Sequence, residues 1–138
     1  MAKTAKEIQT DFYTLLKGSS LAEAVNGGVY RDGMRPRDSK KEDIVIIFSS
    51  GEEGEIQSGI VTLNIYVPDI TPYRCGTMIE NAARTATLER AAQDWYEGIK
   101  GAMPGYLFRL YNTIHTAADE DISQHLIVVQ IKYKFCNS

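Results

Sequence analysis

The sequence predicts an α+β domain in which a mostly antiparallel sheet of four to five strands packs against one long helix and an N-terminal helix. Apolar residues recur at helical spacing near the start of the chain and again after residue 77, whereas residues 60–67 and 123–135 carry strand patterns. The order of these segments is helix, strands, long helix, strands. Such segregated runs are typical of an α+β fold.

One domain of residues 1–138 accounts for the chain, because 138 residues is the size of a single domain and no repeat or low-complexity segment interrupts it. The net charge of −3 gives no electrostatic reason to expect specific nucleic-acid binding. The N-terminus lacks the apolar segment of a signal peptide, and no apolar run is long enough to cross a membrane. We therefore expect a cytoplasmic protein with no membrane partner.

The first helix is predicted between Thr4 and Gly18. Thr4 and Glu7 have the spacing of a capping box, and apolar residues follow at helical spacing until Gly18 ends the helix. Ser20 and Glu23 repeat the capping-box spacing and predict a short second helical piece that ends at residues 26–28.

A short strand is predicted over residues 28–31, followed by a turn at Asp32 and Gly33. The link that follows, residues 32–43, is held extended by Pro36 and is basic until Glu42 and Asp43 offset its charge. It is interpreted either as a solvated loop or as an arm that contacts a partner. Its basic side chains are Arg35, Arg37, Lys40 and Lys41.

A β-hairpin is predicted next. Residues 44–48 are a β-branched and aromatic run typical of a buried strand, and residues 60–67 alternate as a half-buried strand does. Between them lies a polar, glycine-rich turn with an acidic tip. The tip lacks the alternating oxygen ligands of a calcium-binding loop, so a solvated hairpin tip is favoured over a calcium site. Its carboxylates are Glu52, Glu53 and Glu55.

A long helix is predicted to begin either at Thr71 and Pro72 or at Thr77, and to run to about Lys100. A strand over residues 106–114, an acidic loop over 116–121 and a last strand over 123–135 complete the fold. The apolar stripe of the long helix is expected to include Ile79, Ala82, Ala83, Ala86, Ala91, Trp95 and Ile99.

Groups with catalytic potential are sparse. His115 and His125 flank the last hairpin loop, where they are interpreted as solvent-facing side chains rather than metal ligands, because their spacing matches no ligand motif. Cys75 and Cys136 form no metal-binding spacing and are expected to be free thiols, although a bridge between them stays open. The sequence therefore predicts no catalytic, cofactor-binding or metal-binding residue, and no enzyme.

The order of elements resembles a known family. The residues that carry the resemblance are Phe-Tyr-Thr-Leu-Leu at 12–16, Gly-Val-Tyr-Arg at 28–31, the Pro36 link, and the strands Ile-Val-Ile at 44–46 and Val-Thr-Leu-Asn-Ile-Tyr-Val at 61–67. With the long helix and the C-terminal hairpin, they resemble the tail-completion or tail-terminator proteins of tailed bacteriophages and prophages. The segment 68–76 departs from this pattern.

The resemblance implies a structural protein that forms a ring, possibly a hexamer, which terminates the tail tube or joins head and tail. It implies self-association, contacts with tail-tube and neck or connector proteins, and a location in the bacterial cytoplasm during assembly and in the virion afterwards. The candidate contact segments are the link 32–43 and the hairpin tip 49–57. Their candidate interaction residues are Arg35, Arg37, Lys40, Lys41, Glu52, Glu53 and Glu55.

Other functions fit the same sequence. The principal alternative is a small α+β ligand-binding or regulatory module, which predicts an apolar pocket between the sheet and the long helix. An enzyme that uses the end of the molecule with His115 and His125, and a plain nucleic-acid-binding protein, are further alternatives.

Overall fold

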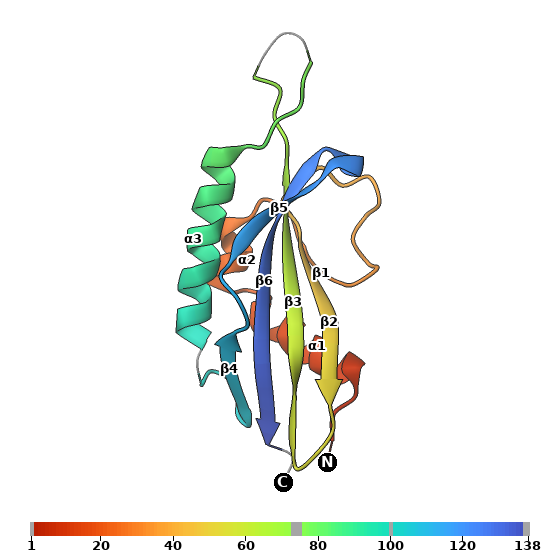
Figure 1. Ribbon diagram of the computed structural model, residues 1–138, viewed down its shortest axis with the longest axis vertical. Helices are drawn as coiled ribbons and strands as arrows, with labels where there is room; N and C mark the ends of the chain where they lie inside the picture. Colours follow the sequence, from red (N-terminus) through yellow and green to blue (C-terminus); the bar gives the residue numbers. More distant parts are fainter. Residues whose placement is uncertain (1, 73–75, 100, 137–138) are drawn as a thin grey trace.

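The computed structural model describes residues 2–72, 76–99 and 101–136, and shows an elongated α+β domain (Figure 1). Strands run along the long axis, and both chain ends lie near the same end of the molecule. The elements in chain order are α1 (Ala5–Leu16), α2 (Ser20–Ala24), β1 (Val29–Arg31), β2 (Ile44–Glu52), β3 (Ile56–Pro68), α3 (Ala82–Ile99), β4 (Tyr106–Leu110), β5 (His115–Asp119), the 3-10 turn η1 (Glu120–Ile122) and β6 (Gln124–Cys136).

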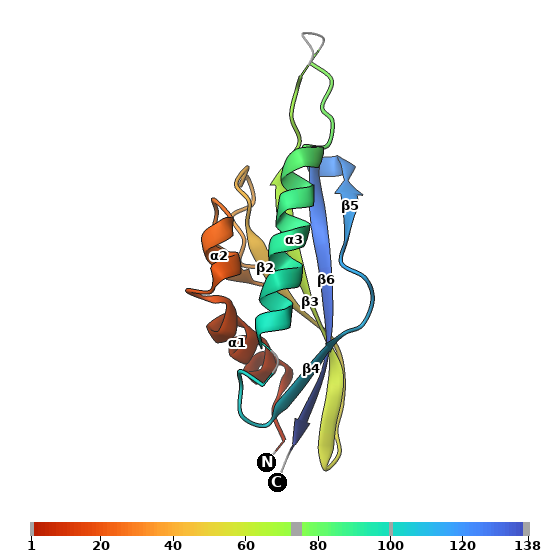
Figure 2. The same ribbon diagram turned by 90° about the vertical axis from the view of Figure 1, so that its left-hand side faces the viewer.

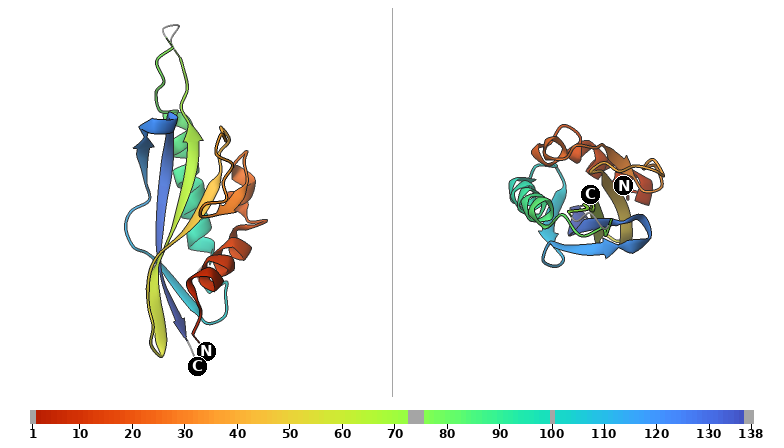
Figure 3. Two further views of the ribbon diagram at one scale, coloured as in Figure 1. Left: turned by 90° about the vertical axis from the view of Figure 1, so that its right-hand side faces the viewer. Right: turned by 90° about the horizontal axis from the view of Figure 1, so that it is seen from above.

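The six strands form one sheet in the order β1-β2-β3-β6, with both β4 and β5 paired to the far side of β6. All pairs are antiparallel except β1 with β2, which is parallel. Helices α1, α2 and α3 lie on one face of the sheet, and no α-helix of the described residues lies on the opposite face (Figures 2 and 3). The predicted α+β class with a mostly antiparallel sheet is therefore confirmed, with six strands instead of four to five.

The core lies between this sheet and the helices. The alternation predicted for β3 and β6 is confirmed, because Val61, Leu63 and Ile65 are fully buried and so are Val129 and Ile131. Helix α1 adds Ile8, Phe12 and Leu16 from one stripe. Two edge-to-face aromatic contacts join α1 to β4: the Phe12 ring centroid lies 6.3 Å from that of Tyr106 and 5.3 Å from that of Phe108.

The predicted start of α1 is confirmed. Thr4 Oγ1 accepts a hydrogen bond from the Glu7 N–H (3.3 Å), and Glu7 Oε1 accepts one from the Thr4 N–H (3.0 Å), so the capping box is complete. The second helical piece begins one residue earlier than predicted, because Ser19 and not Ser20 caps it: its hydroxyl accepts from the Ala22 N–H at 3.2 Å.

The long helix starts later than either predicted position. Ile70 and Ile79 form an antiparallel bridge with reciprocal backbone hydrogen bonds of 2.9 Å, and the described residues between them, 71–72 and 76–78, are not helical. Asn81 then caps α3, since its side chain accepts from the Arg84 N–H at 3.3 Å. The predicted end at Lys100 lies outside the described residues.

The predicted stripe of α3 is largely wrong. Of the seven residues expected on it, only Trp95 and Ile99 are buried, and the alanines of the first turns are exposed. Neighbouring positions such as Thr85 and Leu88 face the sheet instead, and their side chains remove more apolar surface from water than the predicted alanines would. The buried residues of α3 are Thr85, Leu88, Ala92, Trp95, Tyr96 and Ile99.

The strands also extend beyond their predicted ends. The turn predicted over residues 49–55 shrinks to 53–55, because β2 continues to Glu52 and β3 begins at Ile56. Of the strand predicted over 106–114, only β4 up to Leu110 is formed, and the predicted acidic loop 116–121 instead contains most of β5. Strand β6 is 13 residues long and forms backbone hydrogen bonds with the start of β3 and with β5. Both of these segments are strands although their sequences lack the apolar pattern of a strand.

Candidate interaction surfaces

The link 32–43 follows from the parallel pairing of β1 and β2, because the chain must return along the sheet before β2 can begin. The link reaches the face that the helices leave open, where the Arg35 guanidinium lies 3.9 Å from the ring centroid of Tyr66. The sequence therefore predicted correctly that this segment connects two strands, but it did not predict the parallel pairing of β1 with β2 that requires the connection.

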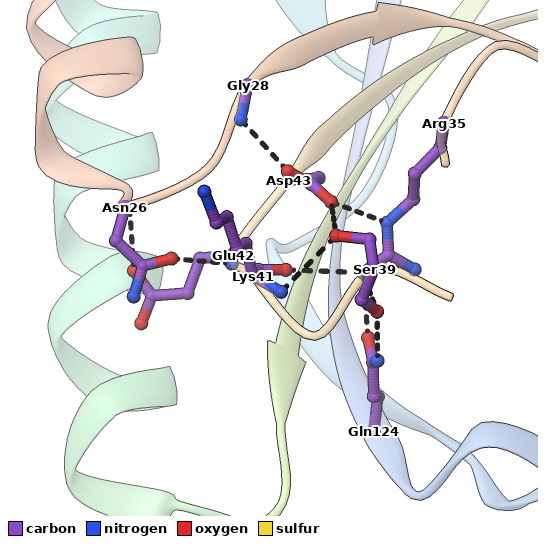
Figure 4. Close-up of polar contacts among 8 residues, drawn as sticks. All are labelled: Asn26, Gly28, Arg35, Ser39, Lys41, Glu42, Asp43 and Gln124. Atoms are coloured by element: carbon purple, nitrogen blue, oxygen red, sulfur yellow. Dashed lines mark hydrogen bonds and ion pairs between the residues drawn. The ribbon is translucent and has the colours of Figure 1, made fainter. Parts of the chain in front are cut away.

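Asp43 pins the link to the fold (Figure 4). Its side chain is only 1% exposed, and its carboxylate accepts hydrogen bonds from Arg35 Nε (2.8 Å), the Gly28 N–H (2.9 Å) and the Ser39 hydroxyl. Arg35 also donates through Nη2 to the carbonyl oxygens of Ser39 and Lys41 and to Gln124 Oε1 at 3.0 Å. One ion pair thus ties together both ends of the link and the start of β6.

The pKa of Asp43 reflects this environment. Burial alone would raise the pKa, but the hydrogen bonds from Ser39, Gly28 and Arg35, together with the Arg35 charge, outweigh burial and hold the pKa below its usual value. Asp43 is therefore ionised at neutral pH and acts as a fixed acceptor.

Glu42 makes a second buried ion pair on the helix side. Neighbouring residues of an extended chain point to opposite sides, and Figure 4 shows Glu42 directed away from Asp43, toward Asn26 and the helices. Its carboxylate accepts from Arg84 Nε (2.6 Å) and Nη2 (2.8 Å), and Arg84 donates further to the Ala24 carbonyl (2.6 Å). Asn26 exchanges two hydrogen bonds with Glu42, at 2.8 and 3.2 Å.

The other basic residues of the link stay outside this network. Arg37, Lys40 and Lys41 are exposed, and within the described chain their side chains make no ion pair or hydrogen bond. Residues 36–41 and Tyr30 line a surface hollow of about 630 Å³. Of the predicted interaction residues on the link, these three are available to a partner, whereas the Arg35 side chain is 13% exposed and engaged internally.

The hairpin tip carries the predicted acidic residues, and the structure brings them together. Glu52, Glu53 and Glu55 are all exposed at the lower end of the β2–β3 hairpin, and Ile56 beside them is 59% exposed. The hairpin stem is tightly packed: a Cβ on Gly59 would lie 2.1 Å from the Ser50 carbonyl oxygen. A close-packed stem thus ends in three carboxylates that have no ion-pair partner among the described residues.

An arm, described over residues 69–72 and 76–81, projects beyond the opposite end of the sheet (Figure 1). Its described part exposes three large apolar side chains, Ile70, Met78 and Ile79, at 38–43%. At its base, His125 Nδ1 lies 2.6 Å from Asp69 Oδ1 and His125 Nε2 lies 3.6 Å from Glu80 Oε1. His125 is thus 20% exposed and partnered, which corrects the expectation of a solvent-facing side chain.

The two histidines lie apart in the sheet register. His115 pairs with Val128, three positions from His125 along β6, and its Nδ1 lies 2.9 Å from the Thr113 carbonyl oxygen. Among the described residues, no three His, Cys, Asp or Glu side chains are grouped to hold a metal ion. The possible bridge of Cys75 to Cys136 involves a residue outside the described chain, so it stays a prediction.

The space between the sheet and α3, where a ligand-binding module is expected to have an apolar pocket, is occupied by packed side chains of α3. Leu88 and Ala92 are fully buried there, and Trp95 is 4% exposed. Of the described helices, none is both long and apolar enough to span a membrane.

Sequence reasoning missed the buried ion pairs and the arm. The signal for the buried ion pairs was the position of Glu42 and Asp43 directly before a strongly apolar strand. A charged side chain that is buried beside such a strand needs a partner of opposite charge. The signal for the arm was the competition between two helix starts, at Thr71 and Thr77.

Comparison of the chain with models of known protein families and with curated proteins finds no match.

Proposed function

We propose that this protein is a structural subunit that assembles with copies of itself into a ring, and that the ring terminates a phage tail tube or joins tail to head. The observation that carries the proposal is where the exposed apolar side chains lie. In the described chain, none of the large exposed apolar residues lies on a helix of the core-covering layer; all lie on the link, the hairpin tip, the arm, β4 and the turns beside β4 and β6. They are Met34, Ile56, Ile70, Met78, Ile79, Leu107, Tyr111 and Ile122.

This distribution supports assembly over chemistry. Single exposed apolar residues are ordinary on a monomer, but a group such as Ile70, Met78 and Ile79 on a projecting arm is a surface that a partner covers. The projections stand at opposite ends of an elongated domain (Figure 1). Contacts between different surfaces of identical subunits are heterologous, and heterologous contacts close into rings when the rotation between neighbours allows.

Electron microscopy of the purified protein, alone and mixed with a tail-tube subunit, tests the proposal. We expect rings of uniform diameter in the first sample and tubes capped at one end, with restricted length, in the second. Met78→Asp on the arm should reduce both, whereas Ala86→Asp on the exposed face of α3 is the matched control and should reduce neither. A protein that stays monomeric and leaves tube length unchanged would refute the proposal.

A further inference from the structure

Two charged surfaces of this chain match each other but lie too far apart to meet within one molecule. The acidic tip (Glu52, Glu53 and Glu55) and the basic hollow (Arg37, Lys40 and Lys41) are separated by the length of β2 (Figure 1). Nine residues of strand span about 30 Å at ~3.3 Å per residue. This is several times the screening length of about 8 Å at physiological salt, so neither surface neutralises the other in a single protomer.

The two surfaces are complementary in more than charge. Beside its three carboxylates the tip exposes Ile56, and beside its three cations the hollow is lined by the half-buried Tyr30 and the exposed Pro36. Only Asp38 interrupts the basic lining. Four further charged groups at this end of β2, in the pairs of Asp43 with Arg35 and of Glu42 with Arg84, are already satisfied internally.

We infer that the acidic hairpin tip of one copy docks into the basic hollow of the next, so that each neighbour contact in the proposed ring includes this pairing beside the apolar contacts. The occupant is a second copy of this chain, because the chain itself carries a segment of the matching charge and apolar content. The contact is heterologous, since different surfaces meet, and this is the type of contact that a ring repeats. The inference rests on the proposed function and names the surfaces that would build it.

Charge reversal tests the pairing. A hollow-reversed variant carries Arg37→Glu, Lys40→Glu and Lys41→Glu. A tip-reversed variant carries Glu52→Lys, Glu53→Lys and Glu55→Lys. These six side chains are exposed and unpartnered in the described chain, so both variants should keep the wild-type unfolding midpoint. In sedimentation velocity, each variant alone should need at least about tenfold more protein to assemble, because like charges then face each other.

An equimolar mixture of the two variants provides the decisive experiment. In the mixture, the acidic hollow of the hollow-reversed variant meets the basic tip of the tip-reversed variant. The basic hollow of the tip-reversed variant meets the acidic tip of the hollow-reversed variant, so assemblies in which the two variants alternate should form again. Wild-type assembly should also weaken as salt rises from about 0.05 to 0.5 M.

The outcomes separate the two proposals. Reversed variants that assemble as the wild type does would overturn the pairing and leave ring formation by other surfaces intact. Loss of assembly in the variants without recovery in the mixture would also overturn it, because the basic hollow would then face another partner, such as nucleic acid. A wild type that does not assemble alone or on tail tubes would overturn the pairing and the proposed function together.

Discussion

Two sets of charged residues at the ends of the same strand are used in opposite ways. At the start of β2, Glu42 and Asp43 are buried and each is paired with an arginine. At its end, Glu52 and the two glutamates that follow are exposed and unpaired among the described residues. The first set is committed to the fold of the protomer, and the second is left available to something outside it.

The comparison shows why charge in the sequence is a poor guide to contact residues. Arg35 and Arg37 differ by two positions and carry the same charge, yet Arg35 holds the link in place while Arg37 lines an open hollow. Only residues of the second kind are candidates for partner contacts. Substitution of the two kinds should therefore have separable effects, on folding in one case and on assembly in the other.

The largest effect is expected from Asp43→Ala. This change removes the acceptor for Arg35, Ser39 and the Gly28 N–H, and leaves a mostly buried guanidinium without its counter-charge. The free energy of unfolding should fall by about 3 kcal/mol or more, measured by urea denaturation. Asp38→Ala in the same link, where the side chain is exposed, is the matched control and should change it by less than about 0.5 kcal/mol. Equal effects would show that the link is not pinned by Asp43.

A double-mutant cycle on Glu42 and Arg84 comes next. The two-point hydrogen bonding and the 7% exposure of Glu42 predict a coupling of about 2 kcal/mol between Glu42→Ala and Arg84→Ala. The exposed pair Arg90 and Asp94, one turn apart on α3, is the control and should couple by about 0.3–0.5 kcal/mol. A coupling energy between Glu42 and Arg84 no larger than that of the control pair would show that the charges at the start of β2 are not committed to the fold.

The pH dependence of stability provides a third test. The pKa of Asp43 is lowered in the folded state from an ordinary value of 3.8, so the folded state binds this proton less readily than the unfolded state does. Its stabilising contribution is complete above that value and is lost as pH falls through the lowered folded-state pKa. The difference in unfolding free energy between wild type and Asp43→Asn should therefore shrink over the interval of pH below 3.8. A difference that stays constant over this interval would contradict the assignment.

The smallest effect on stability is expected from Lys40→Ala with Lys41→Ala. Both side chains are exposed and unpaired among the described residues, so the unfolding free energy should change by less than about 0.5 kcal/mol while assembly weakens. Thermal unfolding and sedimentation velocity on the same sample measure the two quantities. A loss of stability matching that of Asp43→Ala would place these lysines in the fold and not on a contact surface.

Much of the fold was predictable from patterns within single segments. The capping box at Thr4 and the alternation in β3 and β6 depend on neighbours in sequence, and both were read correctly. The extension of β2, the formation of β5 in the predicted acidic loop, and the arm before α3 depend on pairing with distant segments. A sequence pattern carries no record of such pairing, because backbone hydrogen bonds form regardless of side-chain type.

The candidate contact residues show the same division. The sequence identified the charged link and the acidic tip, but it did not distinguish Arg35 from the other three basic residues. That distinction depends on Asp43, Gln124 and Tyr66, which lie near Arg35 only after the sheet has formed. The arm side chains Ile70 and Met78 were missed for a related reason, since helix signals around them outnumber strand signals.

The mass of the unmodified protein in solution, measured over a wide range of concentration, tests most directly whether this chain builds surfaces for copies of itself. We expect a single multimer with few intermediates, because a ring gains its last contacts only when it closes. A mass of 15.4 kDa, that of one chain, at every concentration would contradict the account.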